Sequence, residues 1–283
     1  MKSIAVLTCW YGPYPWYLPY FIHSCSFNPS VDFIIITDNT EQIPDKPGNI
    51  TIINKPLAEI KLVASEKLGF TANLNYAYKL CEFKPAYGFI FSEIIKGYDF
   101  WGYSDLDLIY GDLRSFITPE MLNIYDFISL RHDYTTGCFA LNRNTGLLNN
   151  FFTRSKDYKY VFSDPEYHNF DECGFAFKDL HLGKSIFEAS SAIESYTHIM
   201  KAADSNGELK AHFDFILLEG ATGRLTFDNG RIFYKNELEA ILYHLVTFKR
   251  TCVVPKKVEN IPPYYTISPT KIHHSKQQLL QTT

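Results

Sequence analysis

The stretch YDFWGYSDLDLIYGDL, residues 98–113, decides the fold. An aromatic and apolar run leads directly into Asp105 and Asp107, which a single leucine separates. Apolar runs without polar alternation are typical of strands that are buried on both faces of a parallel sheet. We therefore expect a central strand whose carboxyl end carries two aspartates. Asp112 is expected only to cap the segment that follows Gly111.

The residues before this stretch have the order of a βαβ unit. Residues 3–8 and 32–37 are apolar runs that predict buried strands, and residues 17–29 have the spacing of a crossover helix. Further expected elements are a strand at 49–55, helices over 57–83, 86–95 and 145–155, and strands at 126–132 and 136–144. The pattern predicts an α/β fold, a Rossmann-like mixed sheet flanked by helices, in a single globular unit with two abutting halves.

The overall composition excludes several classes of protein. The 283 residues carry a formal net charge of −4, so no basic footprint predicts nucleic-acid binding. No apolar run reaches the roughly 20 residues of a transmembrane helix, and the first residues lack the pattern of a signal peptide. The six scattered cysteines, without a CxxC pair, are typical of reduced, buried thiols. We expect a cytoplasmic protein; peripheral association with the inner face of the membrane and the oligomeric state stay open.

The two aspartates have the spacing of a metal site. Residues i and i+2 of an extended segment point the same way, so both carboxylates can reach one ion. Two like charges this close favour a bound cation, and carboxylates suit Mg²⁺ or Mn²⁺, whereas no Cys/His cluster in the sequence suggests zinc. The triplet by itself equally fits a solvated acidic turn after a strand.

The context of the aspartates resembles a known superfamily. A βαβ opening with an aromatic first turn, an acid after the second strand and a central strand ending in DxD resemble the GT-A glycosyltransferases. Residues 79–113 resemble, more specifically, a bacterial family of glycosyltransferases of polysaccharide biosynthesis that carries a DFWGxxDxD motif. The resemblance implies a GT-A-like fold and a hexosyltransferase-type enzyme. It would transfer a monosaccharide from a nucleotide diphosphate sugar to a glycan or lipid-linked acceptor, using Mn²⁺ or Mg²⁺.

The same resemblance assigns roles to individual residues. Asp105 and Asp107 would hold the metal ion on the diphosphate, with His244 as a third ligand; as a residue type, His244 equally fits a core or surface histidine. Asp38 would contact the ribose or base. The nucleotide would also be lined by the first-strand loop and by the serine before the DxD pair: Thr8, Cys9, Trp10, Tyr11 and Ser104.

Three lysines are candidate phosphate contacts. Lys249 follows His244 closely, and a cation there can meet a phosphate. Lys79 and Lys84 flank LCEF before a proline and are assigned to the nucleotide, with solvated charge at a helix end as the alternative.

A further set of residues is predicted to contact the donor or acceptor sugar. Aromatic rings and a loop rich in polar groups suit sugar faces and hydroxyls. The set comprises Trp16, Arg131, His132, Asp133 and Gly137, of which Gly137 would let the backbone approach a sugar closely. For the aromatic residues of the first turn, packing is an equal alternative.

Asp171 and Glu172 are the candidate catalytic residues. An inverting transferase needs a carboxylate near the acceptor hydroxyl to take its proton, whereas a retaining one does not. The alternative is a helix N-terminus stabilised by acids. The sequence leaves the stereochemical outcome, the sugar and the acceptor open.

The expected organisation has three parts: residues 1–112 bind the nucleotide sugar, 113–250 bind the acceptor and carry catalysis, and 251–283 form a peripheral segment. Two other functions fit the pattern. One is a non-catalytic carbohydrate-binding or assembly protein on the same fold. The other is a sugar nucleotidyltransferase, although the first turn lacks its glycine-rich basic loop.

Overall fold

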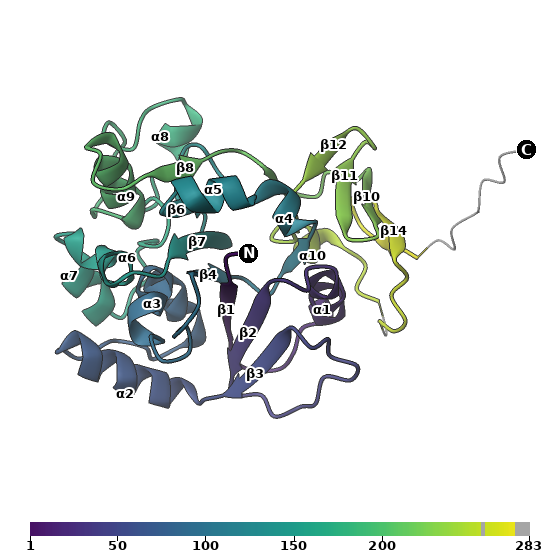
Figure 1. Ribbon diagram of the computed structural model, residues 1–283, viewed down its shortest axis with the longest axis horizontal. Helices are drawn as coiled ribbons and strands as arrows, with labels where there is room; N and C mark the ends of the chain where they lie inside the picture. The colour runs from purple at the N-terminus through teal and green to yellow at the C-terminus, as the bar shows by residue number, and fades with distance from the viewer. Residues whose placement is uncertain (256–257, 275–283) are drawn as a thin grey trace, which may run out of the picture.

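The computed structural model describes residues 1–255 and 258–274. Its centre is a seven-stranded mixed sheet in the order β3-β2-β1-β4-β7-β6-β8 (Figure 1). The strands are β1 Ile4–Trp10, β2 Asp32–Thr37, β3 Ile50–Asn54, β4 Phe100–Ser104, β6 Phe127–Ser129, β7 Phe139–Arg143 and β8 Ala211–Phe213. The first four run parallel, and β7 runs antiparallel to β4. The predicted fold class, a Rossmann-like mixed sheet flanked by helices in one unit, is confirmed.

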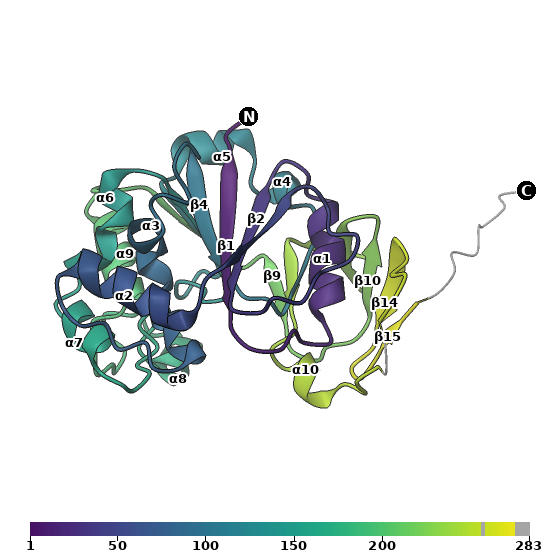
Figure 2. The ribbon, with the colours of Figure 1, turned by 90° about the horizontal axis from the view of Figure 1, so that it is seen from below.

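Helices cover both faces of this sheet (Figure 2). Along β1 the side chains alternate, so that Ala5 and Leu7 enter one apolar core while Ile4 and Val6 enter the other. One core packs against α2 Leu57–Leu68, α3 Tyr87–Ile90, α6 Gly146–Asn149, α7 Tyr158–Ser163, α9 Tyr196–Ser205 and the 3₁₀ segments Ala77–Ala86 and Phe151–Arg154. The other packs against α1 Leu18–Ser26, α4 Leu113–Phe116 and α5 Pro119–Ile124. A short helix, α8 Phe177–His181, belongs to a small separate core.

Two smaller sheets join distant parts of the chain. In the first, β5 Leu108–Tyr110 pairs antiparallel with β13 Leu242–His244, which pairs parallel with β9 Leu217–Glu219. The second has the order β12 Leu238–Ala240, β11 Arg231–Tyr234, β10 Leu225–Asp228, β14 Tyr264–Ile267 and β15 Ile272–His273. The helix α10 Phe248–Thr251 follows β13. Of the expected peripheral segment 251–283, β14 and β15 thus complete a sheet, and residues 275–283 lie outside the described residues.

One predicted helix is much shorter than expected. The helix predicted over 57–83 ends at Leu68, because Gly69 adopts a left-handed conformation with φ of 75° and its N–H bonds to the carbonyl of Ser65. The prediction is wrong from Gly69 to Tyr76, after which a 3₁₀ segment begins. The helix expected over 86–95 is regular only in α3.

The role predicted for Asp112 is confirmed. Its side chain accepts hydrogen bonds from the backbone N–H groups of Arg114 and Ser115 at the start of α4. Asp112 therefore caps a helix and satisfies donors that the helix itself cannot.

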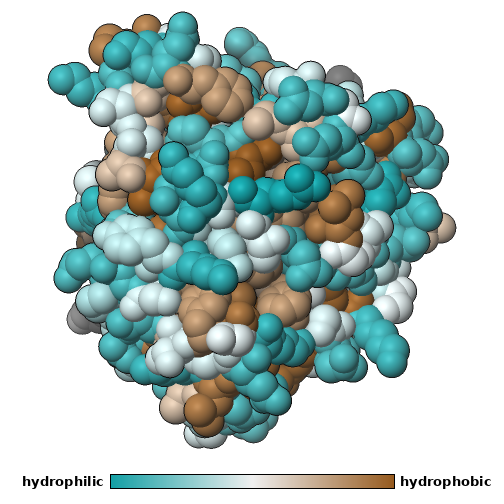
Figure 3. All heavy atoms as spheres, turned by 90° about the vertical axis from the view of Figure 1, so that its left-hand side faces the viewer, coloured by the Kyte–Doolittle hydropathy of each residue, from teal (hydrophilic) through white to brown (hydrophobic). Residues whose placement is uncertain are grey.

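The surface is mixed rather than uniformly polar. Figure 3 shows separate apolar patches among hydrophilic side chains on the face formed by the helices at the left of Figure 1. Exposed large apolar residues of the chain include Tyr160, Phe175, Leu182 and Phe187. None of the helices within residues 1–255 and 258–274 is long and apolar enough to cross a membrane.

Candidate functional site

Asp105 and Asp107 lie in the connection between β4 and β5, at the carboxyl end of the parallel strands. Leu106 between them is buried in the core, so the two carboxylates face away from it. The connection is fixed at both ends, because Asp105 N–H donates to the Cys138 carbonyl and Leu245 N–H donates to the Asp107 carbonyl, each at 2.9 Å. Ligands bind at this edge of open α/β sheets.

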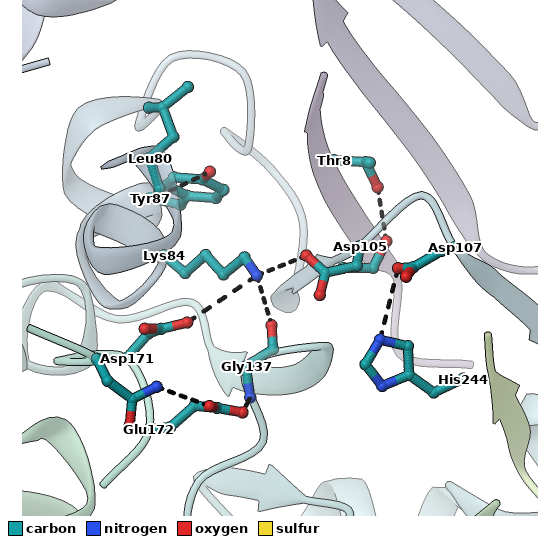
Figure 4. A network of polar contacts seen from close by, with 12 residues as sticks. Thr8, Leu80, Lys84, Tyr87, Asp105, Asp107, Gly137, Asp171, Glu172 and His244 are labelled. Carbon is teal, nitrogen blue, oxygen red and sulfur yellow. Dashed lines mark hydrogen bonds and ion pairs between the residues drawn. The ribbon is translucent and has the colours of Figure 1, made fainter. Parts of the chain in front are cut away.

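His244 joins the two aspartates through the small sheet. The register pairs His244 with Leu108 of β5, directly after the acidic connection. Nε2 of His244 lies 3.5 Å from Oδ1 of Asp107, and ligand atoms of Asp105, Asp107 and His244 all lie within 4.8 Å of one another (Figure 4). Two carboxylate oxygens and one imidazole nitrogen suit Mn²⁺ or Mg²⁺ and leave positions for phosphate and water. The residues present therefore fit the ion that the sequence predicts.

Glu219 is a site residue that the sequence analysis missed. Its Oε1 lies 2.9 Å from Nδ1 of His244, and β9 and β13 pair these two residues directly. The signal that could have found it is the acid at the end of the apolar run FILLEG, residues 215–220. Carboxylates that hold the second nitrogen of a metal-binding histidine fix the ring and its tautomer.

Arg131 and Asp133 lie behind Glu219. Arg131 makes a two-pronged ion pair with Asp133, with N to O distances of 2.9 and 2.8 Å, and donates to Oε2 of Glu219 at 3.2 Å. The guanidinium predicted to contact a sugar is therefore engaged with two carboxylates.

Two lysines neutralise the aspartates. Lys84, which is buried, donates to Oδ1 of Asp105 at 2.6 Å and to the Gly137 carbonyl at 2.7 Å. Lys249 donates to Oδ2 of Asp107 at 2.6 Å. Figure 4 shows the Lys84 ammonium between Asp105 and Asp171. Its Nζ lies 4.0 Å from Oδ2 of Asp171. The site thus combines anionic metal ligands with cations that can meet a diphosphate.

Asp171, which is buried, and Glu172, which is partly buried, form an acidic pair on the far side of Lys84. Glu172 accepts from Gly137 N–H at 3.0 Å and from the Asn169 amide at 2.8 Å, and Tyr167 donates its hydroxyl to Asp171 at 3.1 Å. Gly137 permits this approach, because a Cβ there would lie 2.8 Å from Asp171 Oδ2 and 2.9 Å from Glu172 Oε1.

The acids of the site are tuned in opposite directions. Burial alone would raise the pKa of Asp107, but the hydrogen bonds and charges of His244 and Lys249 outweigh it and hold that pKa below its usual value. For Asp171 burial dominates over Lys84 and raises the pKa well above its usual value, and burial also raises the pKa of Glu172. Carboxylates whose pKa values are shifted apart suit different roles. The lowered pKa of Asp107 suits an ionised metal ligand, and the raised pKa values of Asp171 and Glu172 suit a proton acceptor.

The predicted nucleotide-lining residues lie at the same sheet edge. Thr8 Oγ1 and Ser104 Oγ are 2.6 Å apart between β1 and β4. Asp38, at the end of β2, accepts from Gly12 N–H at 2.9 Å and so anchors the loop that follows Trp10. Cys9 and Trp10, the last residues of β1, and Tyr11, which begins that loop, are partly buried.

Three predicted residues are not brought into this site. Lys79 is fully buried in an ion pair with Glu82 and donates to the Val161 carbonyl at 3.0 Å. Trp16 packs edge-on against Tyr17, with ring centroids 5.5 Å apart, in the core beside the second small sheet. His132 is exposed, and its carbonyl accepts from Lys201 at 2.7 Å.

Comparison with known proteins finds a family and several loosely similar folds. Residues 6–276 match a protein family of unknown function. No curated protein matches the sequence. One similar solved structure is the galactosyltransferase LgtC with donor and acceptor sugar analogues, at 12% identity and a TM-score of 0.33, covering 57% of this chain and 66% of that chain.

A second similar structure is the apo form of mouse xyloside xylosyltransferase 1, at 10% identity and a TM-score of 0.43, covering 86% of this chain and 98% of that chain. An active-site mutant of LgtC has a TM-score of 0.34 at 11% identity, covering 76% of this chain and 75% of that chain. With TM-scores below 0.5, these likenesses carry no weight for function, which must come from the geometry of the site.

Proposed function

The chain belongs to the family of unknown function DUF6625, and we propose that this member is a metal-dependent glycosyltransferase. In this proposal it transfers a monosaccharide, a hexose by the sequence resemblance, from a nucleotide diphosphate sugar to a glycan or lipid-linked acceptor. The resemblance of residues 79–113 further suggests a role in bacterial surface polysaccharide biosynthesis. The reaction would take place in the cytoplasm or at the inner face of the membrane.

The observation that carries the proposal is the cluster of Asp105, Asp107 and His244 with Lys84 and Lys249 beside it. Metal-binding carboxylates with a cation on each side suit a ligand that is itself strongly anionic, and a diphosphate has that charge. A bound Mn²⁺ or Mg²⁺ would stabilise the negative charge of the leaving nucleoside diphosphate. Lys84 and Lys249 would exchange their aspartate partners for phosphate oxygens, since both ammonium groups already lie at the ion site.

The surrounding residues would orient the two substrates. Asp38 and the residues from Thr8 to Tyr11 would line the nucleoside at the ends of β1 and β2, and Ser104 would hold that edge through Thr8. Asp171 or Glu172 would take the proton of the acceptor hydroxyl if the reaction inverts the anomeric centre, because burial raises the pKa of each carboxyl and makes its carboxylate a stronger base. Gly137 keeps room for these carboxylates.

Calorimetry with Mn²⁺ and a panel of uridine, guanosine and cytidine diphosphates tests the first step. We expect one of these nucleotides to bind only in the presence of the ion, and Asp105→Asn and Asp107→Asn to remove that binding while circular dichroism stays unchanged. Asp112→Asn is the matched control, because it lies in the same acidic stretch but caps α4, and asparagine is an equally good cap.

The outcomes separate the proposal from its alternatives. Turnover of nucleotide sugars that both aspartate variants retain would exclude the metal-dependent mechanism. Metal-dependent nucleotide binding without hydrolysis of, or transfer from, any nucleotide sugar would favour a non-catalytic binding protein. Formation of nucleotide sugar and pyrophosphate from sugar phosphate and nucleoside triphosphate would indicate a nucleotidyltransferase.

A further inference from the structure

A second group of metal-ligating side chains lies next to the candidate ion site. The thiol of Cys138, the carboxylate of Glu219 and the imidazole of His244 have ligand atoms within 4.8 Å of one another. The proposed glycosyl transfer uses only His244 of these three as a ligand. Neither the spacing nor the order of the sequence indicated this cluster, since its members come from the residue before β7 and the last residues of β9 and β13.

The backbone holds the three side chains in place independently of any ion. Glu219 and His244 are direct partners in the register of β9 and β13. Cys138 precedes β7, and its carbonyl accepts from Asp105 N–H at 2.9 Å. Cys138 is buried and His244 nearly so, while the Glu219 side chain is 31% exposed. The cluster is therefore ordered and can be reached from one side.

The chemistry of this donor set differs from that of the aspartate set. One sulfur, one nitrogen and one oxygen are ligands that Zn²⁺ accepts together, and three protein ligands with an open fourth position are the arrangement of many zinc sites. A thiol selects against Mg²⁺ and Mn²⁺, which prefer oxygen ligands.

His244 belongs to both sets, which couples them. Its Nδ1 faces Glu219 and its Nε2 faces Asp107. An ion bound to Cys138 and Glu219 would draw the imidazole toward itself and would add two positive charges beside the aspartate pair. Both effects oppose a hard divalent ion at Asp105 and Asp107.

We propose that Cys138, Glu219 and His244 form a second cation site, selective for Zn²⁺, whose occupancy excludes Mn²⁺ or Mg²⁺ from the aspartate site. The zinc site stands on its own donor set, whereas the competition rests on the proposed function. The enzyme would then be inhibited by a thiophilic ion that does not displace its substrates directly.

Cobalt binding to the whole chain tests the site without any assay of activity. Co²⁺ bound by a thiolate gives a charge-transfer absorption in the near ultraviolet, which oxygen and nitrogen ligands alone do not give. We expect this band in the unmodified protein and in Asp105→Asn, its displacement by Zn²⁺, and its loss in Cys138→Ala. Cys173→Ala is the matched control, because Cys173 is also buried but lies in a separate small core.

The affinity for Zn²⁺ supplies the second measurement. Cys138→Ala should weaken Zn²⁺ binding by about 100-fold or more. The loss of a residue that only supports a metal ligand costs about 10- to 100-fold, and the loss of a direct ligand should cost at least as much. The affinity of Cys138→Ala for Mn²⁺, measured by the electron paramagnetic resonance of the free ion, should stay within about twofold of that of the unmodified protein. Retained Mn²⁺ binding would also show that the variant is folded. No band in the unmodified protein, a band that survives Cys138→Ala, or unchanged Zn²⁺ affinity in that variant would overturn the site.

Competition is measured separately. Zn²⁺ should weaken Mn²⁺ binding in the unmodified protein and should have no such effect in Cys138→Ala. Simultaneous, independent binding of both ions would overturn the exclusion. If the proposed function fails but the zinc site is real, the result differs: the cobalt band is present, while no nucleotide binds in the presence of any ion. If Cys138→Ala does not fold, Glu219→Gln replaces it, and the expected result is a retained thiolate band with weaker Zn²⁺ binding.

Discussion

Nδ1 of His244 lies 2.9 Å from Oε1 of Glu219, while Nε2 of the same ring lies 3.5 Å from Oδ1 of Asp107. The imidazole therefore has a carboxylate at each nitrogen, one behind it and one in front. Glu219 is in turn held by Arg131 at 3.2 Å. This arrangement fixes the plane of the ring so that Nε2 faces the aspartate pair, and it makes Glu219 a positioning residue for the candidate ion site.

Replacing Glu219 tests this positioning. Glu219→Gln should weaken Mn²⁺ binding by about 10- to 100-fold, because the ring loses the charge that fixes its tautomer. The measurement is a Mn²⁺ titration followed by electron paramagnetic resonance. Glu239→Gln is the control, since Glu239 pairs with Arg231 in the hairpin of the second small sheet. Equal Mn²⁺ affinity in both variants would refute the positioning role.

Lys79 and Lys84 should respond differently to the same substitution. Lys79→Met leaves Glu82 charged and fully buried, so the free energy of unfolding should fall by about 3 to 5 kcal/mol. Lys84→Met leaves Asp105 charged with 29% of its side chain exposed, and the loss should be smaller, about 1 to 3 kcal/mol.

Nucleotide binding should follow the opposite order. Lys84→Met should abolish metal-dependent binding of a nucleoside diphosphate, whereas folded Lys79→Met should retain it. Urea unfolding and calorimetry on both variants provide the comparison. Retained binding in Lys84→Met would remove this lysine from the site.

Gly137→Ala should impair transfer without unfolding the protein. The new Cβ would lie 2.8 Å from Asp171 Oδ2 and 2.9 Å from Glu172 Oε1, so both carboxylates must move. A displacement of about 1 Å at a reacting group can cost about 100-fold in rate. The check is kcat together with the melting temperature. Gly146→Ala should be silent, because its Cβ would meet nothing within 4 Å; a similar kcat for both variants would contradict the steric explanation.

The stability of the protein should fall on acidification through His23. Burial, aided by the nearby His274, lowers the pKa of His23 from its ordinary 6.5 to about 4. Between these values the unfolded chain binds a proton that the folded chain does not, so the free energy of unfolding decreases as the pH falls from 6.5 to about 4. The ring packs against Phe27, Phe227 and Tyr265.

His23→Phe keeps this packing and removes the titration. Its free energy of unfolding should therefore depend less on pH between 6.5 and 4 than that of the unmodified protein. His181→Gln, at an exposed position, should leave the original pH dependence intact. The measurement is urea unfolding across this pH range. If the free energy of unfolding depends on pH equally in His23→Phe and in the unmodified protein, His23 is not the source of the pH dependence.

Local hydrophobic patterns in the sequence were enough to predict most strands of the central sheet. The apolar run at 32–37 predicts β2 to the residue, and the run before Asp105 predicts β4, because a strand buried on both faces leaves an uninterrupted apolar signature. Periodicity failed where a single backbone conformation decided the outcome. The apolar spacing continues past Leu68, but Gly69 terminates the helix there.

The candidate site divides in the same way. The aspartates could be found from the sequence because they follow a predicted strand. In open α/β sheets, ligands bind at the carboxyl ends of the parallel strands. No local pattern distinguishes Lys84 from Lys79, since both precede the same proline. The structure separates them: one ammonium reaches Asp105 and the other is enclosed with Glu82.

By itself, the sequence determined the fold class and the position of Asp105 and Asp107 at the end of the central strand, because both follow from local hydrophobic patterning. Only the tertiary structure decided what surrounds them. Glu219 and His244 meet the aspartates through the pairing of β5, β13 and β9, and Cys138 meets them from the residue before β7. Contacts over such separations depend on strand register, which no short window of sequence specifies.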